Sequence, residues 1–264
     1  MPASAVARIA PSAVHPPSAV TASVLSGLLV DERDRDTPGL AIPRPETQLV
    51  VRFGASGRTG VDVHAVGVRR GVHRKLIHRG QLTLSARLHP GASQAVLGVP
   101  ASAIAGRIVR LDELWSGAPT QRLLARLASA HDAAEAAAAL ERAIAERLPL
   151  AQECRARVQL VRAAASQLTR SKVSTVAAEL GVSERHLRRA FHEGMGMSPK
   201  AFAQLERFQR ALHAARTEGH ASWASIAAAT GYYDQAHLIA EFRAIAGLTP
   251  RALLSECRAT QLIV

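Results

Sequence analysis

The sequence predicts a multi-domain chain, with an α+β N-terminal region and an all-α C-terminal region that contains two helix-turn-helix units. Two observations carry this prediction. First, one pattern occurs twice after residue 170: small residues, then a glycine turn, then a helix that ends near a Phe. Second, short strand-like segments separated by glycines lie before residue 90. The length of 264 residues leaves room for two domains.

The repeated unit is defined by residues at a nearly fixed offset. Gly181 and Gly231 are 50 positions apart, whereas Phe191 and Phe242 are 51 apart, as are the Gly-x-Ser/Thr-Pro segments that follow each Phe. The second turn therefore contains one additional residue, just after its glycine. A duplicated unit of this size indicates two copies of one helical supersecondary structure.

The turn of each unit has the residues that a sharp helix-helix junction needs. Gly181 and Gly231 can adopt the left-handed conformation that ends a helix. Ser183 and Asp234 can cap the next helix by accepting a hydrogen bond from a free backbone N–H group. Apolar residues then recur at helical spacing in both copies: Val176, Ala177, Leu180, Val182, Leu187 and Phe191, and Ile226, Ala227, Thr230, Tyr232, Leu238 and Phe242.

An ordinary helical hairpin without a DNA role is the alternative for either copy alone. Two copies favour DNA binding, and so does the charge. The net charge is +12, and residues 155–264 carry 15 Lys and Arg against 8 Asp and Glu. A basic chain favours an anionic partner, although basic composition alone is weak support.

The second unit resembles the AraC/XylS family of transcriptional regulators. The resemblance rests on three segments, Gly231-Tyr232-Tyr233-Asp234-Gln235, Glu241-Phe242-Arg243 and Gly247-Leu248-Thr249-Pro250, and covers roughly residues 155–258. It implies a seven-helix DNA-binding domain in which a long helix joins the two units. Independently, Ser198-Pro199 predicts the start of such a helix over residues 198–216, with Phe202, Leu205, Phe208 and Leu212 on one face.

Candidate base-reading residues lie on the second helix of each unit. The first helix carries Arg185, His186, Arg188 and Arg189, and the resemblance directs the three arginines toward the major groove. Arginine can bond bidentately to guanine. For any single arginine, a phosphate contact or a solvated face stays an open alternative.

The second unit has fewer polar residues at the matching positions. Gln235 can pair with adenine, and His237 follows two positions later, among Ala236, Ile239 and Ala240. This helix therefore reads bases weakly or mainly docks. Lys200, Arg243 and Arg251 are candidates for phosphate contacts. Ser174 and Thr249, as helix caps, would present backbone N–H groups to phosphates.

The N-terminal region is predicted to contain a small antiparallel sheet or barrel followed by helices. Residues 48–53, 61–68 and 81–88 have strand-like patterns, and residues 92–96, 102–108, 120–130 and 133–148 have helical ones. The segments 88–100 and 109–115 resemble the N-terminal domain of a branch of AraC-type regulators. That resemblance implies a cupin-like sensor or oligomerisation domain.

No enzyme is predicted. His64, His73, His78 and His89 are isolated in sequence, so a cupin metal site is not expected, and no cofactor is. Nucleotide-binding and hydrolase motifs are absent. Only Cys154 and Cys257 are present, far apart, and a disulfide is not expected. With no apolar run of membrane length, a cytoplasmic location is expected.

The expected organisation is a flexible lead-in over residues 1–17, an effector-sensing or oligomerisation domain over 18–150, a linker over 151–156 and an AraC-type DNA-binding domain over 157–258. The expected function is sequence-specific transcriptional regulation controlled through the N-terminal domain. The alternative is an effector-independent architectural DNA-binding protein. Expected partners are double-stranded operator DNA, RNA polymerase, a small-molecule effector and a second copy of the chain, with no membrane.

Overall fold

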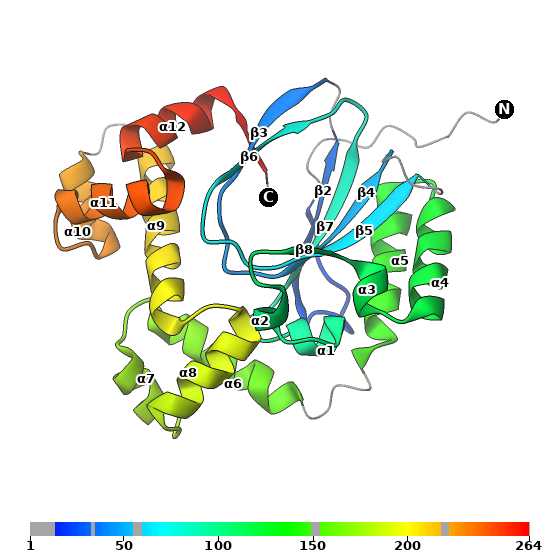
Figure 1. Cartoon of the computed structure of the whole chain (residues 1–264), viewed down its shortest axis with the longest axis horizontal. Coiled ribbons are helices and arrows are strands. Elements are labelled where there is room, and N and C mark those ends of the chain that lie inside the picture. The colour runs from blue at the N-terminus through cyan, green and yellow to red at the C-terminus, as the bar shows by residue number, and fades with distance from the viewer. Residues whose placement is uncertain (1–13, 33–34, 55–59, 149–153, 218–221, 264) are drawn as a thin grey trace.

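An antiparallel sheet is the framework of the N-terminal region in the computed structural model, which describes residues 14–32, 35–54, 60–148, 154–217 and 222–263 (Figure 1). Its six strands are ordered β1-β2-β7-β4-β5-β8. They are β1 (Val14–His15), β2 (Leu25–Glu32), β7 (Leu82–Leu88), β4 (Gln48–Phe53), β5 (Val61–Val66) and β8 (Ile108–Arg110). Every neighbouring pair in this sheet is antiparallel.

A second, three-stranded sheet joins the two ends of the chain. Its order is β6-β3-β9, from β6 (His73–Ile77), β3 (Thr37–Ala41) and β9 (Gln261–Ile263). Strands β3 and β6 form an antiparallel pair that curves away from the larger sheet, and we call this pair the β3–β6 ribbon (Figure 1). Strand β9 adds to β3 in parallel.

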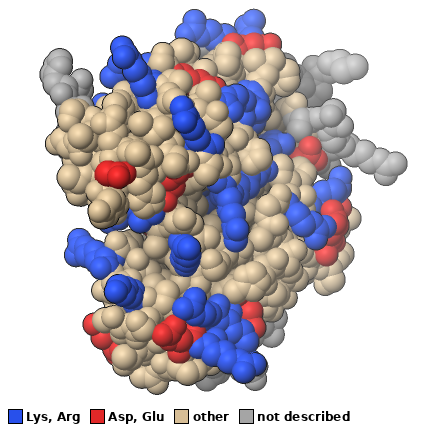
Figure 2. Space-filling model, turned by 60° about the vertical axis from the view of Figure 1, so that its left-hand side comes forward, with Lys and Arg blue, Asp and Glu red and all other residues tan. Residues whose placement is uncertain are grey.

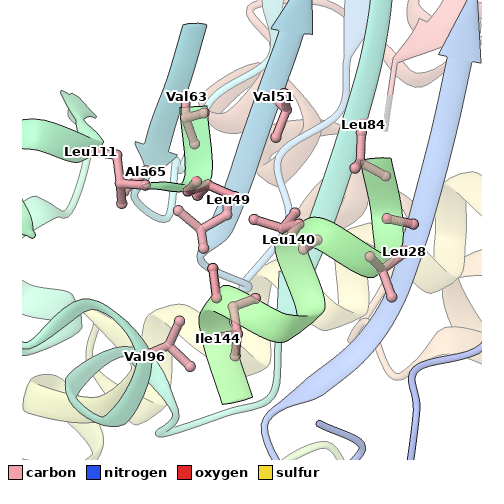
Figure 3. Packing of buried hydrophobic residues seen from close by; sticks show 14 of the residues in the cluster. Leu28, Leu49, Val51, Val63, Ala65, Leu84, Val96, Leu111, Leu140 and Ile144 are labelled. Atoms are coloured by element: carbon pink, nitrogen blue, oxygen red, sulfur yellow. The ribbon is translucent and has the colours of Figure 1, made fainter. Parts of the chain in front are cut away.

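Short and medium helices cover one face of the larger sheet. They are α1 (Ser93–Leu97), α2 (Ala101–Ile104), α3 (Leu111–Leu114), α4 (Gly117–Ala128) and α5 (Ala133–Ala145). Leu140 and Ile144 of α5 pack onto alternate strand residues such as Leu49, Val51 and Leu84 (Figure 3). Because side chains alternate along a strand, the intervening residues lie on the opposite face, toward the ribbon.

The C-terminal region is helical. It contains α6 (Cys154–Leu168), α7 (Val173–Glu179), α8 (Glu184–Met195), α9 (Pro199–Thr217), α10 (Trp223–Thr230), α11 (Gln235–Ala246) and α12 (Pro250–Ala259). Helix α9 separates α7 and α8 at one end from α10 and α11 at the other (Figure 1). In the part of the chain that the structure describes, no helix is long and apolar enough to span a bilayer.

The expected α+β and all-α organisation is confirmed. Predicted strands 48–53, 61–68 and 81–88 correspond to β4, β5 and β7, and the predicted long helix 198–216 corresponds to α9, which has 19 residues. Helices predicted at 92–96 and 120–130 correspond to α1 and α4.

Two helix predictions were partly wrong. The helix expected over 102–108 ends at Ile104, because Gly106 adopts a left-handed φ of 73° and Ile108 then starts β8 beside β5. The helix expected over 133–148 ends at Ala145. Strands β2, β3 and β6 were not predicted. In β6 four of five residues are exposed, so the pattern of a half-buried strand is missing.

The two regions share a hydrophobic core. Leu40 of β3 and Val68, which follows β5, are buried in the cluster formed by the C-terminal helices. Two residues of the expected lead-in, Val14 and His15, form β1 beside β2, whereas residues 1–13 lie outside the described residues. The expected linker, 151–156, overlaps the start of α6 and otherwise also lies outside them. The four expected ranges remain predictions.

Gly67 is required where β5 meets α2. A Cβ atom at Gly67 would lie 1.8 Å from the backbone oxygen of Ile104, whereas a Cβ atom at Gly27 would have no heavy atom within 4 Å. We therefore expect Gly67→Ala to lower the free energy of unfolding by about 2–3 kcal/mol through overpacking. Gly27→Ala is the matched control and should change it by no more than about 0.5 kcal/mol. Urea unfolding of both variants checks this, and equal stability would contradict it.

Candidate nucleic-acid interface

The first helix-turn-helix unit consists of α7, a four-residue turn over 180–183 and α8. Gly181 has a left-handed φ of 66°, as expected for the residue that ends α7. The hydroxyl of Ser183 accepts a hydrogen bond from the backbone N–H of His186 at 3.2 Å, so Ser183 caps α8. Val176, Leu187 and Phe191 are buried between the helices. The packing leaves the N-terminal half of α8 at the surface.

The basic residues in the N-terminal half of α8 are exposed. These are Arg185, His186, Arg188 and Arg189, whereas Leu187 and Ala190 are buried. Arg188 donates to the carboxylate of Glu184, one turn earlier, at 2.8 Å. In the free protein the guanidinium of Arg188 is therefore oriented by an ion pair, whereas no such pair within the described residues involves Arg185 or Arg189.

The second unit repeats this geometry. Gly231 has a φ of 86°, and the carboxylate of Asp234 accepts a hydrogen bond from the backbone N–H of His237 at 2.7 Å, capping α11. Gln235, Ala236, His237 and Ala240 are exposed, whereas Leu238 and Phe242 are buried. The exposed surface of α11 thus has few groups that can form directed hydrogen bonds to bases.

Tyr233 was not predicted to have a role, yet it is 92% exposed in the turn that precedes α11. The neighbouring Tyr232 is buried at 5% exposure. The sequence signal was available, because one of two adjacent aromatic residues in a turn of this kind must leave the core.

A buried ionic network fixes α11 to the connecting helix α9. Arg207 of α9 donates from Nη2 to Oε2 of Glu241 at 2.5 Å, and the hydroxyl of Tyr232 donates to Oε1 of Glu241 at 2.7 Å. The side chain of Glu241 is only 6% exposed. The guanidinium of Arg207 also lies 4.7 Å from the centre of the Tyr232 ring. The network therefore sets the orientation of the second recognition helix through three separate contacts.

The pKa values follow from this arrangement. Burial, together with the hydrogen bond to Glu241, raises the pKa of Tyr232 above its ordinary value, so its hydroxyl stays a donor. Burial lowers the pKa of Arg207, but the hydrogen bond and charge of Glu241 outweigh it and raise the pKa overall. Arg207 therefore stays cationic at neutral pH.

The candidate phosphate-contacting residues lie beside the two units. Lys200, Arg243 and Arg251 are exposed, at the start of α9, within α11 and at the start of α12 respectively. Thr249 caps α12 by accepting from the backbone N–H of Ala252 at 3.3 Å. The expected capping role of Ser174 was wrong, because α7 begins one residue earlier than Ser174 and its N-cap position is Lys172.

Helix α9 supplies one aromatic contact to each unit. Phe202 packs edge-on against Phe191 of α8 with ring centres 5.3 Å apart, and Phe208 packs against Phe242 of α11 with ring centres 4.6 Å apart. The recognition helices lie at the two ends of one rigid connector.

Figure 2 shows Lys and Arg side chains spread over this side of the molecule, with acidic side chains among them and a hollow between its upper and lower parts.

Residues 176–256, which hold both units, match the family described as helix-turn-helix domain. This part of the chain is an AraC-type helix-turn-helix domain. No curated protein matches the chain.

Solved structures of ToxT align with most of the chain at low similarity. ToxT from Vibrio cholerae O395 is 10% identical over 86% of this chain and 95% of that chain, with a TM-score of 0.40. The unsaturated fatty acid bound wild-type ToxT from Vibrio cholerae strain SCE256 is 9% identical over 94% of this chain and 98% of that chain, with a TM-score of 0.42.

The N-terminal region touches both units of the AraC-type domain. At the C-terminal end of α8, Gly196 adopts a φ of 70°, and a Cβ there would lie 2.9 Å from the backbone oxygen of Ala101 in α2. At the other unit, the backbone N–H of Val72 donates to the carbonyl of Ile245 in α11 at 3.2 Å. The amide of Gln209 in α9 donates to the carbonyl of Pro43 at 2.6 Å. Helices α8, α9 and α11 thus each contact the N-terminal region.

A cavity of about 590 Å³ lies between the larger sheet and the β3–β6 ribbon. Its lining combines apolar side chains with charged ones, and cations outnumber acids. Asp31 and Glu46 are the acids, and the Lys and Arg residues are Arg44, Arg52, Arg69, Arg74 and Lys75. Sequence reasoning missed this basic lining, because the residues come from four separate segments. Among the described residues no His, Cys, Asp or Glu cluster suited to a metal ion is present.

The buried network should control the stability of the second unit. Arg207→Ala leaves the carboxylate of Glu241 buried without its cation, and we expect a loss of about 3 kcal/mol of unfolding free energy. Arg210→Ala is the control, because Arg210 is exposed on the same helix and its one hydrogen bond within the described residues, to the carbonyl of Thr169 at 3.5 Å, does not involve the network. Thermal unfolding of both variants checks this. An equal decrease in Tm would show that the network is not required.

Base-reading and phosphate-contacting roles predict different mutational effects. Arg189→Ala should weaken binding to the specific site by about 1–3 kcal/mol while leaving non-specific DNA nearly unaffected, because a bidentate contact to guanine is lost. Lys200→Ala should weaken both DNAs about equally. Fluorescence anisotropy with a mapped site and a scrambled duplex gives, for each variant, the ratio of specific to non-specific DNA affinity. The same ratio for the two variants would refute the assignment.

Proposed function

We propose that the protein is a sequence-specific transcriptional regulator that binds operator DNA through two helix-turn-helix units and is controlled through its N-terminal region. The main support is the position of the two recognition helices. Both are capped, both are exposed at their N-terminal turns, and they lie at the two ends of α9. With 19 residues, α9 is about 28 Å long. Successive major-groove segments on one face of DNA repeat every 34 Å or so.

The two units contribute differently to recognition. In the first, Arg185, Arg188 and Arg189 supply the hydrogen-bond donors that read guanine, and His186 lies beside them. In the second, Gln235 reads adenine, His237 supplies a further polar group, and the remaining contacts are made to methyl groups. Phosphate contacts come from Lys200, Arg243, Arg251 and the Thr249-capped turn, and the exposed hydroxyl of Tyr233 is suited to the same role.

The cavity is the proposed effector site. Its volume of about 590 Å³ is within the range of small-molecule sites, and its apolar walls are combined with an excess of cations. An effector of matching chemistry is a small molecule with an anionic group. The effector-sensing domain then comprises residues 18–150, the linker 151–156 and the DNA-binding domain 157–258. We place the protein in the cytoplasm with its DNA, and as a binding protein rather than an enzyme.

The second candidate is an architectural DNA-binding protein without an effector. The contacts between the N-terminal region and α8, α9 and α11 favour it, because they are consistent with a purely structural support. A thermal-shift screen with small anions on the full chain separates the two. Stabilisation by an anion, lost in Arg52→Met, supports an effector site, whereas no shift by any anion supports the architectural role. RNA polymerase and a second copy of the chain remain proposed partners.

A 5-base-pair insertion tests whether both units enter the groove. One chain should protect about 15–20 base pairs of a non-palindromic site, since α9 spans nearly one helical repeat. Inserting 5 base pairs between the half-sites rotates one half to the opposite face of the DNA and should reduce affinity to that of a single half-site. An insertion of about 10 base pairs on the same site is a second test of spacing. Affinity unchanged by the 5-base-pair insertion would contradict the proposal.

A further inference from the structure

The β3–β6 ribbon has two faces with different neighbours. Directly paired residues lie on the same face, so Ala41 and His73 share one face with Gly39 and Lys75, whereas Leu40 and its partner Arg74 lie on the other. The first face borders the cavity, whose lining includes Ala41, His73 and Lys75, and Arg74 of the other face is also among the lining residues. The ribbon is therefore a single layer of two strands that separates the cavity from the C-terminal helices.

The outer face of the ribbon is attached to the AraC-type domain. Leu40 is fully buried in the core of the C-terminal helices. Arg74 forms a two-point ion pair with Glu256 of α12, from Nε to Oε1 at 2.5 Å and from Nη2 to Oε2 at 2.7 Å. Strand β9, which follows α12 directly, pairs with β3 over 39–41. Apolar packing, an ion pair and backbone pairing thus hold α12 to the ribbon.

The inner face of the ribbon opposes other cations across the cavity. Although Lys75 is partly open to solvent, desolvation of its ammonium group within the cavity lowers its pKa, the nearby charges of Arg52 and Arg69 lower it further, and Asp31 partly compensates. The pKa of His73 is lowered by burial and by Arg69. Arg52 lies on β4 of the larger sheet, opposite the ribbon. Like charges on the two walls repel each other and oppose closer approach of the ribbon to the sheet.

We propose that the β3–β6 ribbon couples the cavity to the second helix-turn-helix unit: an anion between Lys75, Arg52 and Arg69 draws the ribbon toward the sheet, and α12 and β9 move with it. Helix α12 packs against α11 and α9, so its displacement changes the orientation of the second recognition helix. This inference rests on the proposed function, because it names the regulation of the same cavity. Binding of the anion and of DNA must then alter each other by an equal factor.

The experiment compares the full chain with a variant in which the attachment is removed. The variant carries Glu256→Ala and ends at Thr260, which eliminates the ion pair and β9; it substitutes no cavity-lining residue and no exposed DNA-facing residue, but it frees the side chain of Arg74, which lines the cavity. Glu146→Ala is the control, since Glu146 forms a comparable 2.9 Å ion pair with Arg126 far from the ribbon. The probe is anilinonaphthalene sulfonate, an anion with apolar rings. Its affinity is measured by fluorescence, and DNA affinity by anisotropy with and without it.

In the wild type and in Glu146→Ala, saturating probe should change DNA affinity about fivefold or more. In the variant without the attachment, the probe should still bind but change DNA affinity less than about twofold. A full effect in that variant, or no effect in the wild type despite binding, overturns the inference and leaves the effector cavity in place. If the probe does not bind, or binds Arg52→Met as tightly as the wild type, both the coupling inference and the proposed effector site are wrong.

Amide hydrogen exchange gives a second test that needs no probe. If β9 and Glu256 hold the ribbon, residues 37–41 should exchange at least about tenfold faster in the variant than in Glu146→Ala, while residues 48–53 in the larger sheet stay unchanged. Thermal unfolding confirms that both variants remain folded. Equal exchange of residues 37–41 in the two variants would show that the ribbon is not held by the C-terminal attachment, and the inference would fail.

Discussion

Two aromatic contacts on one helix determine how the DNA-binding surface is built. Phe202 and Phe208 are separated by less than two turns of α9, yet each belongs to a different helix-turn-helix unit through Phe191 and Phe242. Because each ring is buried, neither unit can rotate about α9 without exposing an aromatic side chain. The relative position of the two recognition helices is therefore a property of the core rather than of a linker.

The two units present different side chains to DNA, and different interactions hold their recognition helices in place. The first recognition helix presents several arginines and depends on ordinary apolar packing. The second presents few directed groups, but its position is fixed by Glu241, Arg207 and Tyr232. A helix that reads bases through methyl contacts needs close approach more than flexible side chains. The buried network supplies that rigidity, whereas long arginine side chains in the first unit can adjust to the bases.

The sequence predicted the local features of this structure well and the long-range ones poorly. The caps Ser183, Asp234 and Thr249 and the left-handed Gly181 and Gly231 were predictable, because each depends on neighbours within a few residues. The exposed strand β6 and the basic cavity were not, since neither has a periodic pattern. The ion pair of Arg74 with Glu256 joins residues 182 positions apart, and only the tertiary fold brings them together. The roles of the DNA-facing residues themselves remain predictions.

The parallel pairing of β9 with β3 has a consequence for biosynthesis. Strand β3 emerges from the ribosome more than two hundred residues before its partner, and until β9 follows, one edge of β3 has backbone groups without that partner. An unpaired strand edge can pair with another chain. The β6-β3-β9 sheet is therefore complete only after β9 has been translated, so a fragment released before β9 would carry an aggregation-prone edge and an unfinished cavity wall.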